Sequence, residues 1–124
     1  MTARTTTKGL RILLIEDEPI VAVLAEDLLD AIGCIVVATA ATVADAQAAI
    51  VMHDFDVAMV DIHLGSDDGL VAADTLKARQ IPYLVTTGYD TRDSANAHAS
   101  APVLTKPYGI ADLETALLRC VAGA

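Results

Sequence analysis

The sequence predicts an α/β fold in which a doubly wound, five-stranded parallel sheet carries helices on both faces. Short apolar runs alternate with longer segments of helical periodicity along the whole chain, and strict alternation of this kind favours parallel strands joined by right-handed crossovers. The run Val57–Val60 is apolar without a break and ends in Asp61, which is typical of a strand buried on both faces. With 124 residues, the chain is long enough for one such domain and too short for two.

The first half of the chain contains two strands and two helices. Pro19 suits the first turn of a helix, and Gly33 ends the helical spacing of apolar residues that follows it. Thr42 and Asp45 resemble a capping box that opens the second helix. The expected elements are a strand over Arg11–Ile15, a helix over 19–32, a strand over Cys34–Thr39 and a helix over 43–50.

The second half repeats the pattern. The polar, glycine-containing stretch 62–69 has the chemistry of a turn, Ile81 and Pro82 break a helix, and the alanine-rich stretch 88–101 has no strong period. The expected elements are strands over Val57–Asp61, Tyr83–Thr87 and Pro102–Leu104, a helix over 69–80, a short or frayed helix within 88–101, and a last helix over 110–121.

The order 2-1-3-4-5, known as flavodoxin-like, is one doubly wound arrangement of such strands, and it places strand one beside strand three. Ligands bind in sheets of this kind outside the carboxyl ends of the strands. Strand one runs into Glu16 and Asp17, and strand three ends at Asp61. This order therefore predicts three carboxylates at one rim of the sheet.

Composition limits the function. Lys plus Arg is 8 and Asp plus Glu is 17, a net charge of −9, which argues against direct nucleic-acid binding. No apolar run approaches the roughly 20 residues of a membrane span. Cys34 and Cys120 lack metal or redox spacing, so we expect buried, reduced thiols in a cytoplasmic protein. We expect residues 1–9 to be a disordered tail and residues 10–124 to form the domain.

The predicted rim has the chemistry of phosphoryl transfer. Two carboxylates ~5 Å apart repel by roughly 3 kcal/mol at an effective dielectric near 20, so Glu16, Asp17 and Asp61 need a cation or a proton. A hard divalent ion such as Mg²⁺ suits oxygen ligands of this kind. The ends of the last two strands add Lys106, the Thr87 hydroxyl and the Gly88 N–H. An aspartate among such groups is able to act as a nucleophile and become an aspartyl phosphate.

These four motifs, Glu16-Asp17, Asp61, Thr87-Gly88 and Lys106-Pro107, resemble the active-site set of the receiver domain of bacterial response regulators (CheY-like), in the stand-alone, single-domain type. The resemblance implies that Asp61 accepts a phosphoryl group from a histidine kinase or histidine phosphotransfer protein. It implies that Asp17, Asp61 and the backbone carbonyl of His63 bind Mg²⁺ and that Glu16 acts through water. Lys106, Thr87 and Gly88 would hold phosphoryl oxygens. The implied role is a signalling switch that acts on a downstream protein, and not an enzyme with an external substrate.

Two positions carry residues that differ from those common in this family. Gly65 stands where many receivers carry proline, and Val103 stands where many carry an aromatic switch residue. Because Val103 is too small to serve as that switch, we expect phosphorylation to be signalled to partners through residues 88–101, with Tyr89 as the exposed contact.

Other assignments remain open. Thr86 is the alternative to Thr87 as the residue whose hydroxyl contacts the phosphoryl group. The sequence leaves two alternative functions, a haloacid-dehalogenase-like phosphatase and a non-phosphorylated interaction module. That phosphatase family carries an aspartate at the position where His63 stands.

Overall fold

The computed structural model describes residues 6–65, 67–88 and 100–122. Most of the helix expected within 88–101, together with Tyr89 and the first five residues of the expected tail, lies outside these ranges.

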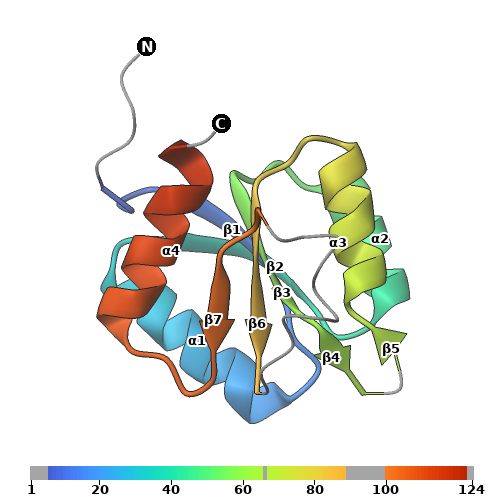
Figure 1. Cartoon of the computed structure of the whole chain (residues 1–124), viewed down its shortest axis with the longest axis horizontal. Coiled ribbons are helices and arrows are strands. Elements are labelled where there is room, and N and C mark those ends of the chain that lie inside the picture. The colour runs from blue at the N-terminus through green and yellow to red at the C-terminus, as the bar shows by residue number, and fades with distance from the viewer. Residues whose placement is uncertain (1–5, 66, 89–99, 123–124) are drawn as a thin grey trace.

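The main sheet has the predicted topology (Figure 1). Its strands lie in the order β2-β1-β3-β6-β7, and each strand is parallel to its neighbours. Because β6 and β7 are the fourth and fifth strands of this sheet along the chain, the order 2-1-3-4-5 is confirmed. The bounds are β1 (Arg11–Ile15), β2 (Ile35–Ala40), β3 (Val57–Asp61), β6 (Tyr83–Thr87) and β7 (Val103–Thr105).

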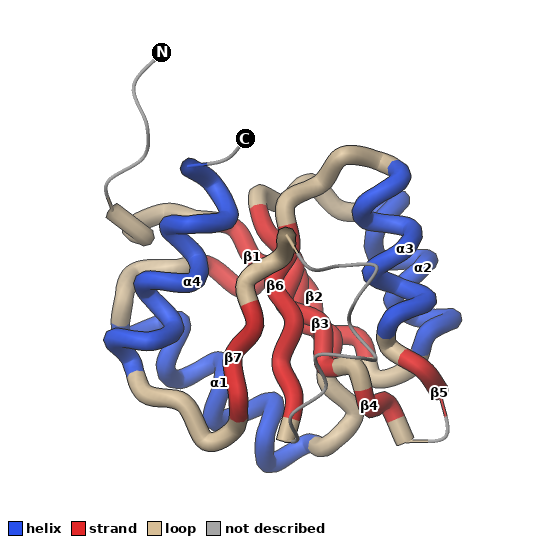
Figure 2. Tube along the Cα trace, in the orientation of Figure 1, coloured by secondary structure: helices blue, strands red, loops and turns tan. Residues whose placement is uncertain are grey.

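Helices cover both faces of the sheet, as the apolar patterns predict (Figure 2). One core cluster joins the sheet to α1 and α4, and the other joins it to α2 and α3. Leu29 and Leu117 are fully buried in the first cluster, and Leu76 is fully buried in the second. Burying an aliphatic side chain of this size stabilises the fold by about 1.5–3 kcal/mol. The bounds are α1 (Pro19–Ala31), α2 (Val43–Met52), α3 (Leu70–Ala78) and α4 (Ile110–Ala122).

Local hydrogen bonds explain where α2 and β2 begin. The Thr42 hydroxyl accepts the Asp45 N–H at 3.0 Å, so the predicted cap opens α2. Cys34 does not begin β2, because its N–H donates to the Leu29 carbonyl and closes the turn after α1.

The stretch 62–69 contains more order than a simple turn. β4 (His63–Leu64) and β5 (Asp67–Asp68) pair antiparallel, with His63 opposite Asp68 and Leu64 opposite Asp67. We call this pair the β4–β5 hairpin. Leu64 is buried among the residues of the α2 and α3 core, and this burial anchors the hairpin to the domain.

The expected boundary of the disordered tail at residue 9 lies too far along the chain. Thr7 is buried, and its hydroxyl donates to the Ile32 carbonyl at 2.7 Å. The Gly9 N–H donates to the Gly33 carbonyl at 2.7 Å. Residues 7–9 therefore pack against the turn after α1, an interaction that depends on a distant segment and leaves no pattern within the tail itself.

Within residues 6–65, 67–88 and 100–122, no helix has the length and apolar character needed to cross a membrane.

Candidate functional site

The carboxyl ends of the central strands bring the predicted rim residues together. Ile15 of β1 is level with Val60 of β3, so Glu16 follows one strand where Asp61 ends its neighbour. Lys106 follows β7 directly, and its backbone N–H donates to the Thr87 carbonyl at 2.7 Å. Glu16 and Asp61 are both buried despite their charge, and a buried carboxylate requires a partner.

Lys106 is that partner for both acids. Its Nζ lies 2.8 Å from Glu16 Oε1 and 2.9 Å from Asp61 Oδ2. The remaining oxygens are also paired: Asp61 Oδ1 accepts the His63 N–H at 2.9 Å, and Glu16 Oε2 accepts the Glu18 N–H at 3.3 Å. The lysine therefore supplies the counter-charge that the sequence requires at this rim.

Burial and neighbouring charges shift the pKa values of this group. Desolvation raises the pKa of Glu16 to about 7, the Lys106 hydrogen bond opposes this rise, and Asp61 adds to it. Burial alone would lower the pKa of Lys106, but hydrogen bonds to Glu16 and Asp61 outweigh burial and raise it. The ammonium of Lys106 therefore stays charged at neutral pH.

The same rim fits a divalent cation. Glu16, Asp17 and Asp61 each offer a carboxylate oxygen, and these atoms all lie within 4.8 Å of one another. Asp17 is only partly buried, and no hydrogen bond from a described residue reaches its carboxylate. Oxygen-only ligands in this charge density suit Mg²⁺, so Asp17 is the carboxylate most available for a metal.

The segment after Asp61 packs closely against this residue. The His63 N–H already donates to Asp61. A Cβ added to Gly69 would lie 2.0 Å from the Asp61 carbonyl oxygen, so this position requires glycine. The pair Asp68-Gly69 is a turn signal in the sequence, but the close approach to Asp61 exists only in the folded chain.

Thr87 and Thr86 are both buried, and burial does not separate them. Thr86 is level with Asp61 in the sheet, and its carbonyl accepts the Ile62 N–H at 3.2 Å. Thr87 is one residue nearer the rim. Gly88 is exposed, and a Cβ built there would meet nothing within 4 Å, so no described residue fills the space beside its backbone.

The positions that depart from the family pattern lie at the surface. Val103 is exposed at the start of β7. Gly65 has a φ of +59°, a region that favours glycine, and an added Cβ would lie 3.5 Å from Asp17 Oδ2. The positive φ therefore favours glycine at this position, and the β4–β5 hairpin lies close to Asp17 there.

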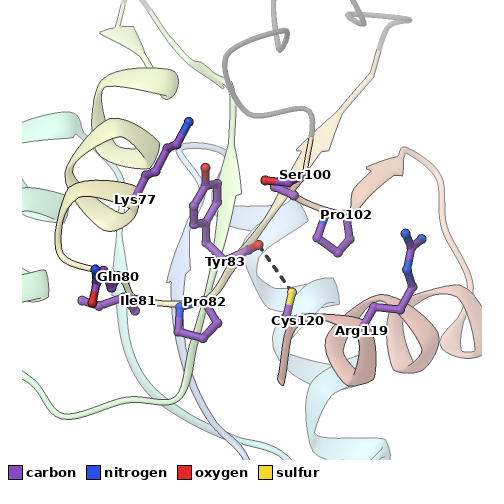
Figure 3. A pocket seen from close by; sticks show the side chains of 10 residues that line it. Lys77, Gln80, Ile81, Pro82, Tyr83, Ser100, Pro102, Arg119 and Cys120 are labelled. Carbon is purple, nitrogen blue, oxygen red and sulfur yellow. Dashed lines mark hydrogen bonds between the residues drawn. The ribbon is translucent and has the colours of Figure 1, made fainter. Parts of the chain in front are cut away.

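A separate cavity of about 440 Å³ lies at the opposite, amino-terminal ends of β6 and β7 (Figure 3). Its lining includes Tyr83 and Cys120, whose thiol donates to the Tyr83 carbonyl at 3.4 Å. Burial raises the pKa of Cys120 to about 12, so this thiol remains protonated. Cys34 is buried as well, and the prediction of buried free thiols is confirmed.

Family comparison agrees with the geometry of the rim. The family model of the response regulator receiver domain matches residues 12–118 of the sequence. The chain therefore belongs to the response regulator receiver family, the signalling domains of two-component systems. A comparison with curated proteins found no match.

Solved structures give the same result. SdrG from Sphingomonas melonis Fr1 is 32% identical, with a TM-score of 0.76 over 97% of this chain and 98% of that protein. The REC domain of the Erythrobacter litoralis PhyR response regulator is 25% identical, with a TM-score of 0.81 over 91% of this chain and 90% of that domain. The response regulator PhyR from Brucella abortus shares the fold at 23% identity and a TM-score of 0.80, over 94% of this chain and 49% of that protein.

Proposed function

We propose that this receiver accepts a phosphoryl group on Asp61 from a histidine kinase or histidine phosphotransfer protein and thereby switches its binding to a downstream protein. The observation that carries the proposal is the ammonium of Lys106, which lies within 3 Å of both Asp61 Oδ2 and Glu16 Oε1, at a rim where the Asp17 carboxylate joins these two acids. We place this activity in the cytoplasm, where free thiols such as Cys34 and Cys120 stay reduced.

The transfer step uses the Asp61 carboxylate as the nucleophile. A carboxylate oxygen forms a bond to phosphorus as the bond from phosphorus to the donor nitrogen breaks, and the donor histidine keeps that electron pair and takes up a proton. Asp17, Asp61 and the His63 carbonyl would hold Mg²⁺, with Glu16 reaching it through water. When bound, the ion supplies positive charge against the phosphoryl oxygens.

The remaining rim groups stabilise the charge of the phosphoryl group. Lys106 is already held at the acceptor and keeps its proton at neutral pH. The Thr87 hydroxyl and the Gly88 N–H would donate to the other phosphoryl oxygens. Donors that are fixed in advance at such a site contribute most of the catalysis in reactions of this class.

The donor protein must reach the rim, and α1 offers the adjoining surface. This helix begins two residues after Asp17, and it exposes Ile20, Val23 and Leu24 at helical spacing. We propose that these side chains contact the donor. Ile20→Glu should slow transfer from a cognate donor about tenfold and leave labelling by acetyl phosphate unchanged. Met52→Glu, an equally exposed position on α2 across the sheet, is the matched control and should change neither rate.

Labelling with acetyl phosphate tests the proposal directly. In the presence of Mg²⁺, one stable phosphoryl group per chain should form, and Asp61→Asn should form none, because the amide is not a nucleophile of this kind. Full labelling of the Asn variant would end the assignment of Asp61.

The same experiment separates the alternatives. Continuous release of phosphate from the donor, with no stable label, would indicate the haloacid-dehalogenase-like phosphatase. No uptake at all would indicate a receiver that serves only as an interaction module.

A further inference from the structure

Asp67 connects the segment after the phosphoryl acceptor to a different helix. Its Oδ2 accepts the backbone N–H of Val43, the first residue of α2, at 3.1 Å across 24 positions of sequence. Figure 1 shows β4 and β5 beside the lower ends of α2 and α3. This side-chain hydrogen bond joins the β4–β5 hairpin to α2.

The contact suits the chemistry of a helix start. The first amides of a helix lack partners within the helix, and a carboxylate is favoured there by the helix dipole. In α2, the Thr42 side chain accepts only the Asp45 N–H. Asp67 therefore satisfies a second amide, and it does so from a distant element, which makes the contact part of the tertiary structure.

The hairpin that Asp67 holds borders both predicted metal-binding acids. At one end, the His63 N–H donates to Asp61 Oδ1 at 2.9 Å. Near its tip, a Cβ on Gly65 would lie 3.5 Å from Asp17 Oδ2. A shift of the hairpin would therefore change the surroundings of both carboxylates and the position of the His63 carbonyl.

Asp68, the next residue, provides the contrast. Its Oδ1 accepts the Leu70 N–H at 2.9 Å, two residues further along the chain. Asp68 thus caps the start of α3, the next element along the chain, and does not connect the hairpin to a distant element through this bond. The two neighbours carry the same charge and make the same kind of hydrogen bond, but only Asp67 makes it across the fold.

We propose that Asp67 is a positioning residue for the Mg²⁺ and phosphoryl site: its bond to the Val43 amide holds the β4–β5 hairpin against Asp17 and Asp61. This inference rests on the proposed function for the identity of the bound groups. Residues that orient metal ligands without touching the metal typically affect metal affinity by about 10–100-fold when they are removed.

The test compares Asp67→Ala, Asp67→Asn and Asp68→Ala in the full chain. Mg²⁺ titration should give a Kd about tenfold weaker for Asp67→Ala, with labelling by acetyl phosphate slowed at low Mg²⁺ and restored at saturating Mg²⁺. Asp67→Asn keeps an oxygen acceptor and should stay close to wild type. Asp68→Ala loses the same charge and should also bind Mg²⁺ as wild type does.

Hydrogen exchange without metal gives an independent measurement. In EDTA, Asp67→Ala should speed exchange of the Val43 and His63 amides, and Asp68→Ala should speed only that of Leu70. Equal Mg²⁺ affinities and equal Val43 and His63 exchange in wild type and Asp67→Ala would overturn the proposal. So would an Asp68→Ala variant that weakens Mg²⁺ binding as much as Asp67→Ala does. A wild-type chain that neither binds Mg²⁺ nor takes up label would instead overturn the proposed function, and the inference with it.

Discussion

The Nζ of Lys106 lies 2.8 Å from Glu16 Oε1, so two residues separated by 90 positions in the sequence form one ion pair at the rim of the sheet. The same Nζ reaches Asp61 at 2.9 Å. Because one ammonium is shared between two buried acids, the charge state of each group depends on the others. This dependence predicts that removing Asp61 and removing Lys106 shift the pKa of Glu16 in opposite directions.

Removing either partner of Glu16 should move its pKa in a different direction. Asp61 raises the pKa of Glu16 and Lys106 lowers it, while burial is the largest cause of the rise to about 7. Asp61→Asn should therefore lower that pKa without returning it to 4.5, and Lys106→Met should raise it above about 7. A ¹³C NMR titration of the Glu carboxyl carbons in metal-free protein measures both, and shifts of the same sign would contradict the arrangement.

The raised pKa also makes stability depend on pH. Between the ordinary pKa of 4.5 and the folded value of about 7, folded Glu16 holds a proton that the unfolded chain releases. The free energy of unfolding of metal-free protein should therefore fall as pH rises through this window. Urea denaturation at several pH values should show this slope in wild type and a smaller slope in Glu16→Gln. Equal slopes in wild type and Glu16→Gln would contradict the raised pKa of Glu16 as the cause.

Mg²⁺ should stabilise the unphosphorylated protein through Asp17. Binding to the folded state at about 100 times Kd contributes about 2.7 kcal/mol, which raises the melting temperature by roughly 10 °C for a domain of this size. Asp17→Ala should remove most of this effect, because that carboxylate has no competing partner within residues 6–65, 67–88 and 100–122, and Glu16→Gln should remove less. An equal rise in melting temperature in wild type and Asp17→Ala would place the metal elsewhere.

Thr87 and Thr86 form a matched pair for the hydroxyl role. Both are buried, so replacing either by alanine should cost similar stability. Thr87→Ala should slow labelling by acetyl phosphate about tenfold or more, since a donor to the transferring group is lost, and Thr86→Ala should stay within about threefold. Thr86 is a demanding control because it is level with Asp61 in the sheet. The reverse result would assign the role to Thr86.

Gly69 and Gly88 form a second pair. Gly69→Ala would place a Cβ 2.0 Å from the Asp61 carbonyl oxygen, whereas the Cβ of Gly88→Ala meets no described residue within 4 Å. The first change should lower the free energy of unfolding by about 3 kcal/mol and the second by less than about 0.5 kcal/mol. Equal unfolding midpoints of the two variants in denaturant would show that the backbone at Gly69 accommodates the added methyl group without loss of stability.

The sequence by itself predicted the five strands of the main sheet to within a residue or so, an order for them that the structure has, and the residues that follow them. Val57–Val60 is apolar throughout, and β3 is buried along its whole length. Period and turn chemistry are local properties of the chain, and parallel strands bring their carboxyl ends to one edge. Glu16, Asp61, Thr87 and Lys106 could therefore be assigned to one rim before any coordinate was known.

Only the tertiary structure decided how these residues are paired. The bridge from Lys106 to both acids, the bond from Asp67 to Val43 and the packing of Thr7 against Ile32 each join segments that are distant in sequence. The spacing of apolar residues along the sequence does not predict such contacts, because the partner of a side chain depends on how whole helices and strands pack together. The β4–β5 hairpin likewise needs Leu64 to be buried in the core, and that burial exists only after α2 and α3 cover the sheet.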